Sequence, residues 1–97
     1  MSRKVQARLH WLIKMPEKPL EISRPARFDH QDENWTQNAW SLVVTTEKSC
    51  EESYQTAVVR FLVPDAPHEW LSVGKRFTLF DGRSPLADGV VEKILTN

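Results

Sequence analysis

Hydrophobic side chains alternate with mostly polar ones near the start of the chain, and this period of two constrains the fold more than any other feature. One face carries Val5, Ala7, Leu9, Trp11 and Ile13, and the other carries Lys4, Gln6, Arg8, His10 and Leu12. Alternation of this kind is typical of a half-buried β-strand, because successive side chains of a strand point to opposite faces. The segment therefore predicts a strand from Val5 to Ile13.

Five further segments are rich in β-branched and aromatic residues and are bounded by turn residues, which predicts strands at 20–28, 40–46, 54–63, 76–80 and 87–95. Pro25 confines the first of these to an edge, a bulge or a strand end. The polar stretch 29–38 predicts a loop. Six strands in a chain of 97 residues indicate one all-β domain over residues 1–97, either a barrel or a sandwich.

Helix is expected only as one or two short turns. Asp65 is a candidate cap for a turn that contains Pro67, and Gly74 would end it. Asp81 and Gly82 predict a tight turn with positive φ, and Gly89 inside the last strand predicts a bulge or a bend. We expect the core to include Val5, Leu9, Trp11, Val59, Phe61, Phe77, Leu79 and Val91.

The residue patterns that support catalysis are missing from the sequence. There is no glycine-rich phosphate loop, no Gly-x-Ser-x-Gly and no His-Glu-x-x-His. His10, His30 and His68 are not spaced as metal ligands, and the acids around His30 do not match a calcium loop. We therefore predict no enzymatic activity, no catalytic residues, no metal site, no cofactor and no nucleotide ligand.

Charge and cysteine content narrow the possible partners and compartment. The 13 basic and 13 acidic side chains give a formal net charge of zero, which does not favour general binding to nucleic-acid phosphates. The charged side chains of residues 1–27 are mostly basic and those of residues 28–72 mostly acidic, so a partner could still be oriented by charge. Cys50 is the only cysteine, and acidic neighbours make it a poor nucleophile, so we expect a free surface thiol. Without paired cysteines, a signal peptide or a membrane span, we expect a cytoplasmic protein.

A partner surface is expected on the loop at 29–40. Four tryptophans are many for so small a core, and Trp35 lies among acids and amides. Trp35 and Trp70 could each close an end of the fold or bind a partner. Our preferred hypothesis is a stand-alone module that binds a protein partner, with Trp35 as the anchor and with Asp32 and Glu33 beside it.

Residues 74–95, with the sequence GKRFTLFDGRSPLADGVVEKIL, resemble the closing strand pair of the third domain of elongation factor Tu without a gap. Upstream, residues 23–28 resemble the Arg-Pro-x-Phe strand of that family. The resemblance implies a six-stranded antiparallel closed barrel.

The resemblance also implies an alternative function. In the family this barrel contacts the T stem of aminoacyl-tRNA, and the corresponding positions are Arg24, Asp81, Gly82 and, next to the family's arginine position, Arg83. A tRNA- or RNA-binding module linked to translation is therefore the second hypothesis. The nucleotide-binding domain of the family has no counterpart here, so we expect no GTP hydrolysis.

Overall fold

The computed structural model describes residues 3–14, 20–47 and 54–97. They form six strands: β1 (Lys4–Trp11), β2 (Glu21–Phe28), β3 (Trp40–Thr46), β4 (Gln55–Phe61), β5 (Arg76–Asp81) and β6 (Ser84–Thr96). Two single 3-10 turns, η1 (Trp35–Asn38) and η2 (His68–Trp70), lie in the loops. The expected break at 15–19 and Cys50 with its turn lie outside the described residues.

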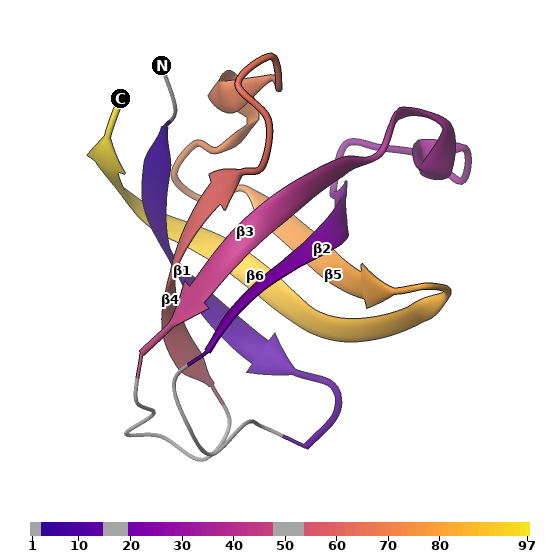
Figure 1. Cartoon of the computed structure of the whole chain (residues 1–97), viewed down its shortest axis with the longest axis horizontal. Coiled ribbons are helices and arrows are strands. Elements are labelled where there is room, and N and C mark those ends of the chain that lie inside the picture. The colour runs from indigo at the N-terminus through magenta and orange to yellow at the C-terminus, as the bar shows by residue number, and fades with distance from the viewer. Residues whose placement is uncertain (1–2, 15–19, 48–53) are drawn as a thin grey trace.

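The strands close into a barrel in the order β1-β4-β3-β2-β5-β6, with β6 paired back to β1, and all pairs are antiparallel (Figure 1). The prediction of an all-β, six-stranded antiparallel closed barrel is confirmed. The loops that carry η1 and η2 lie at the same end of the barrel, as Figure 1 shows.

The core is the inner face of the barrel, and the period-two pattern places it there. In β1 the burial alternates strictly, with Val5, Ala7, Leu9 and Trp11 buried. All eight residues expected in the core are buried. A buried polar pair supports the wall between β1 and β4: the Trp11 indole donates to Oε1 of Gln55 at 3.0 Å. Gln55 in turn donates to the carbonyl of Glu47, so this buried amide is satisfied.

Phe28 is the centre of an aromatic cluster at the loop end. Its ring lies 5.8 Å from Phe61, 5.9 Å from Phe77 and 5.4 Å from Trp70 between centroids. Trp70 packs against the core from the loop and closes this end of the barrel.

The short turns differ from the sequence-based prediction. Residues 29–38 contain η1, which the polar composition did not indicate. The expected cap at Asp65 is wrong: η2 begins at His68, its N-cap is Pro67, and no side chain caps it. Gly74 does not end that turn, because η2 ends at Trp70. Gly74 has φ of 88° and belongs to the next turn, in which the Lys75 amide donates to the Ser72 carbonyl.

The two C-terminal glycines have different roles. Gly82 has φ of 62°, as predicted, and follows Asp81, which pairs with Ser84. Gly82 and Arg83 are therefore the two loop residues, and a positive φ at the first alone indicates a type II′ hairpin turn. Gly89 pairs in regular register with both Leu9 and Phe77, so of the two alternatives, a bulge or a bend, the bulge is wrong. Its Cβ would lie 2.4 Å from the Phe77 ring, so glycine makes room for that ring in the core.

Pro25 occupies the kind of position expected for proline in a sheet. β2 pairs with β3 from Glu21 to Ala26, but its ladder with β5 covers only Ala26–Phe28. The Asp29 amide donates to the Arg76 carbonyl, so the N–H of Asp29 points toward β5. Every second residue of a strand points its N–H to the same side, so an N–H at position 25 would also point toward β5. The β5 ladder has already ended there, so the missing N–H of Pro25 leaves no ladder bond unmade. The prediction of an edge or end position is met within a closed barrel.

Candidate functional site

An open depression of about 780 Å³ lies at the loop end of the barrel. It lies between the loop that follows β2 and the loop that follows β4. Its aromatic residues are Trp35, Trp40 and Trp70, and its charged residues are Asp32, Asp65 and Glu69. The structure therefore brings two of the predicted partner-binding residues, Trp35 and Asp32, together with a second loop. Glu33 is exposed on the same loop but does not line the depression.

Local hydrogen bonds shape the first loop. Oδ1 of Asp32 accepts from the Asn34 amide at 2.9 Å, which is an Asx turn, and the Asp32 carbonyl accepts from the Trp35 amide at 3.1 Å. Gln31 anchors the start of the loop, because its side-chain oxygen accepts from the Phe28 amide at 2.8 Å. A polar sequence thus forms a defined turn that presents Trp35.

The second loop is held by His68 and Trp70. Nε2 of His68 lies 2.8 Å from the Pro64 carbonyl, and the His68 ring packs edge-on against Phe61 at 5.7 Å. Trp70 meets His30 of the first loop at 4.3 Å between ring centroids, edge to face. This contact joins the two loops and fixes one wall of the depression.

Trp35 and Trp70 have different surroundings. Trp70 packs against the core and Phe28, so it closes the barrel end. Trp35 is half-buried, is not part of the core cluster, and lies on Phe80 of β5 with ring centroids 4.8 Å apart. One face of the indole is thus supported while the residue lines the depression.

The depression is lined by three carboxylates, and among the described residues His30 is its one further titratable side chain. Asp32, Asp65 and Glu69 are exposed, and no Lys or Arg is among the lining residues. Like charges in one concave site raise the local concentration of cations and cationic side chains. Chemically, the arrangement suits apolar contact on the indoles combined with ion pairs at the rim.

The positions implied by the elongation factor resemblance are divided between the β5–β6 hairpin and β2. Asp81, Gly82 and Arg83 are exposed at the tip of the β5–β6 hairpin. Arg24 is half-buried on β2, in line with the inward-facing Ala26 and Phe28. Its guanidinium donates to the Ser23 carbonyl at 2.8 Å, and its Nε is buried without a hydrogen-bond partner among the described residues.

Within the described ranges, no group of three or more His, Cys, Asp and Glu side chains is arranged to hold a metal ion. In the same residues, no helix has the length and apolar character needed to cross a membrane.

Comparison with protein-family models, curated proteins and solved structures finds no significant match to this chain. The resemblance to the third domain of elongation factor Tu therefore stays a sequence-based prediction. The part of it that the structure shows is the six-stranded barrel.

Sequence reasoning named Trp70 but missed the place of the two acids of the same loop, Asp65 and Glu69, in the depression, and the contact of this loop with the first one. Residues 65–70 repeat the mixture of acids and tryptophan found at 29–40, and that shared composition was an available signal. What the sequence could not supply was the proximity of the two loops, which follows from β2 and β4 both flanking β3 in the barrel.

Proposed function

We propose that this barrel is a stand-alone binding module that captures a basic segment of a protein partner in the depression at its loop end. The observation that carries the proposal is the lining: three tryptophans and three carboxylates with no Lys or Arg among them. Trp35 is the anchor, because it is supported by Phe80 without belonging to the core. The single cysteine supports the cytoplasm as the place of action.

The chemistry of the partner follows from the lining. Arg or Lys side chains would stack on the indole faces by cation–π attraction and pair with the carboxylates around them. Aromatic anchors surrounded by a polar rim are the usual composition of an interface hot spot. Binding of this type falls as salt rises, because the rim charges are exposed.

The test is a fluorescence titration with two short synthetic peptides of equal length, one rich in Arg and one rich in Glu. We expect the Arg peptide to quench the indole emission saturably and the Glu peptide to leave it unchanged. Trp35→Ala and the pair Asp32→Asn with Glu69→Gln should each weaken binding about tenfold or more. Glu21→Gln, an exposed carboxylate at the start of β2, is the matched control and should bind like the wild type.

Equal binding of both peptides, or equal loss in the Glu21→Gln control, would contradict the proposal. Tight binding of an RNA oligonucleotide that depends on Arg83 and is unaffected by Trp35→Ala would favour the translation-linked alternative instead.

A further inference from the structure

A furrow crosses the outer wall of the barrel over four neighbouring strands, and at β2 it reaches Asp29, the residue before His30 of the loop-end depression. Strand register defines its two walls. One wall is the row His10, Asp88, Thr78 and Arg27, and the other is the row Arg8, Val90, Arg76 and Asp29.

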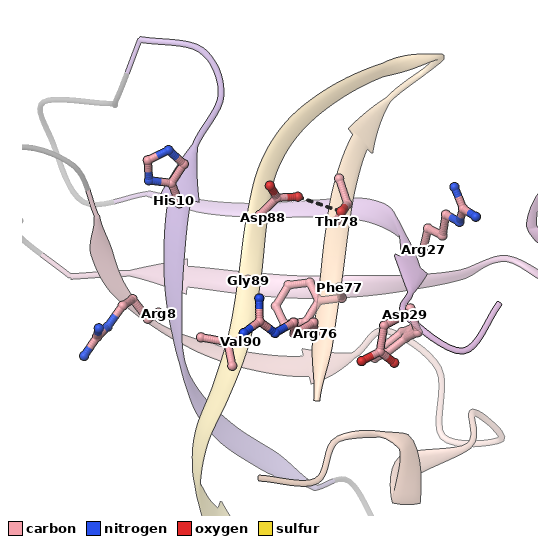
Figure 2. Close-up of a pocket in the computed structure, with 11 residues that line it drawn as sticks. Arg8, His10, Arg27, Asp29, Arg76, Phe77, Thr78, Asp88, Gly89 and Val90 are labelled. Atoms are coloured by element: carbon pink, nitrogen blue, oxygen red, sulfur yellow. Dashed lines mark hydrogen bonds between the residues drawn. The ribbon is translucent and has the colours of Figure 1, made fainter. Parts of the chain in front are cut away.

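The inward-facing row between these walls forms the floor. Leu9 pairs with Gly89, Gly89 with Phe77, and Phe77 with Phe28, so their backbone separates the two outward rows. The hollow measures about 500 Å³, a volume within the range of small-molecule sites. The middle of the hollow has low walls because Thr78, Val90 and Asp88 are short. Figure 2 shows Arg8 and Arg27 pointing outward on opposite sides of the hollow and Arg76 between them.

Most charged groups at the furrow already have a partner. Arg8 forms an ion pair with Glu92 at 3.0 Å and stacks on Tyr54 at 4.6 Å. Asp29 forms an ion pair with Lys75 at 3.0 Å.

Two arginines of the furrow remain available. Arg76 is exposed, and its side chain has no hydrogen bond or ion pair among the described residues. Arg27 makes only a long contact of 3.4 Å with the Gln31 carbonyl. Since Arg27 faces Thr78 directly, Arg76 is its diagonal neighbour across the β2–β5 pair. Rotation of the Arg27 side chain toward Arg76 would bring both guanidinium groups to one shared anion.

Asp88 adds a second type of recognition. Its Oδ1 accepts from the Thr78 hydroxyl at 2.7 Å, which fixes the carboxylate beside the hollow and leaves Oδ2 to accept from another donor (Figure 2). A bare anion would be repelled by this carboxylate, whereas a ligand that carries hydroxyl groups next to its anionic group would satisfy it.

We propose that this furrow binds a small phosphate ester that carries hydroxyl groups, such as a sugar phosphate. Arg76 and Arg27 hold the phosphate through charge-assisted hydrogen bonds, for which the planar guanidinium is suited. Asp88 accepts a hydrogen bond from a ligand hydroxyl. The site is independent of the depression at the loop end, so neither proposal depends on the other.

The test is an NMR titration of the labelled protein with ribose 5-phosphate, inorganic phosphate and ribose at matched ionic strength. We expect saturable shifts of the Thr78, Gly89 and Val90 amides with ribose 5-phosphate, weaker ones with phosphate and none with ribose. Arg76→Gln and Arg27→Gln should each weaken binding about tenfold, roughly the loss of one charge-assisted contact. Lys4→Gln removes one positive charge from an exposed position of β1 outside the furrow and should change nothing.

The Asp88→Asn variant separates the two parts of the proposal. It should tighten binding of inorganic phosphate, because a repelling charge is removed, while the preference for ribose 5-phosphate over phosphate shrinks. Absence of saturable shifts, or equal weakening by Lys4→Gln, would overturn the proposal. A short oligoribonucleotide that binds through Arg76 more tightly than ribose 5-phosphate would support the same chemistry and identify nucleic acid as its source.

Discussion

Gly89 lies where the barrel has no room for a side chain. Its backbone is regular, so the constraint is steric rather than conformational: a Cβ would overlap the Phe77 ring, with 2.4 Å to the nearest ring carbon. Gly82 presents the opposite case, with open space around it but a positive φ of 62°.

Gly89→Ala should lower the free energy of unfolding by about 1–3 kcal/mol through overpacking. Phe77→Leu is destabilising alone but frees space beside Gly89. The Gly89→Ala/Phe77→Leu double variant should therefore lose less free energy of unfolding than the sum of the two single losses. Gly82→Ala should cost about 1–2 kcal/mol through strain, with no coupling to Phe77. Urea unfolding of these proteins and of the Gly82→Ala/Phe77→Leu double variant, six in all, checks this, and strictly additive losses at Gly89 and Phe77 would contradict it.

Gln55 is buried to receive the Trp11 indole N–H. Gln55→Leu leaves this donor without an acceptor in the core, so it should cost about 1–3 kcal/mol. In Trp11→Phe the donor is gone, and Gln55→Leu made in that background should cost clearly less. Thermal unfolding of the four proteins measures this coupling, and an equal cost in both backgrounds would show that the hydrogen bond contributes nothing.

The ionisation of the Asp29 carboxyl is affected by its surroundings. The hydrogen bond from Lys75, reinforced by its charge, lowers the pKa of Asp29 below its ordinary value of 3.8, although desolvation opposes the shift. A lowered folded-state pKa stabilises the protein above the unfolded pKa, and this contribution is lost as pH falls through the folded value. Carboxyl-detected NMR should find the pKa of Asp29 low in the wild type and closer to 3.8 in Lys75→Gln.

At the scale of elements, the two loops at the barrel end have unequal roles. The loop after β4 contributes Trp70, which packs on Phe28 and the core, whereas the loop after β2 contributes Trp35, which rests on Phe80. One loop therefore completes the fold, and the other adds a surface to it.

Trp70→Ala should cost about 3–5 kcal/mol, as expected for truncation of a large aromatic that closes a core. Trp35→Ala should cost only about 1–2 kcal/mol, the loss of one aromatic pair and some buried area. Differential scanning calorimetry of the two variants compares these losses directly. A loss for Trp35→Ala as large as for Trp70→Ala would assign Trp35 to the core and remove it as an anchor.

At the scale of the whole molecule, barrel closure makes the six strands one cooperative structure. Each strand has a neighbour on both sides and all inner faces share one core. The midpoints of denaturant unfolding followed by far-UV circular dichroism and by indole fluorescence should therefore coincide. Separate transitions would show that part of the barrel unfolds independently.

The sequence alone determined the features that depend on neighbouring residues. The alternation at Val5–Trp11 established a strand and its buried face, and Gly82 established a tight turn, because strand periodicity and φ preference are local properties. The eight core residues followed from the same periodicity.

Only the tertiary structure decided which distant segments meet. Asp32 and Glu69 share a depression because β2 and β4 flank β3, and Arg27 and Arg76 become neighbours because β2 pairs with β5. Strand order and register are set by closing the whole barrel around one core, so no local pattern specifies them. Gly89 shows the same limit. Its place inside a strand predicted a bulge or a bend, whereas the structure shows that the Phe77 ring, across the β5–β6 ladder, excludes a side chain at this position.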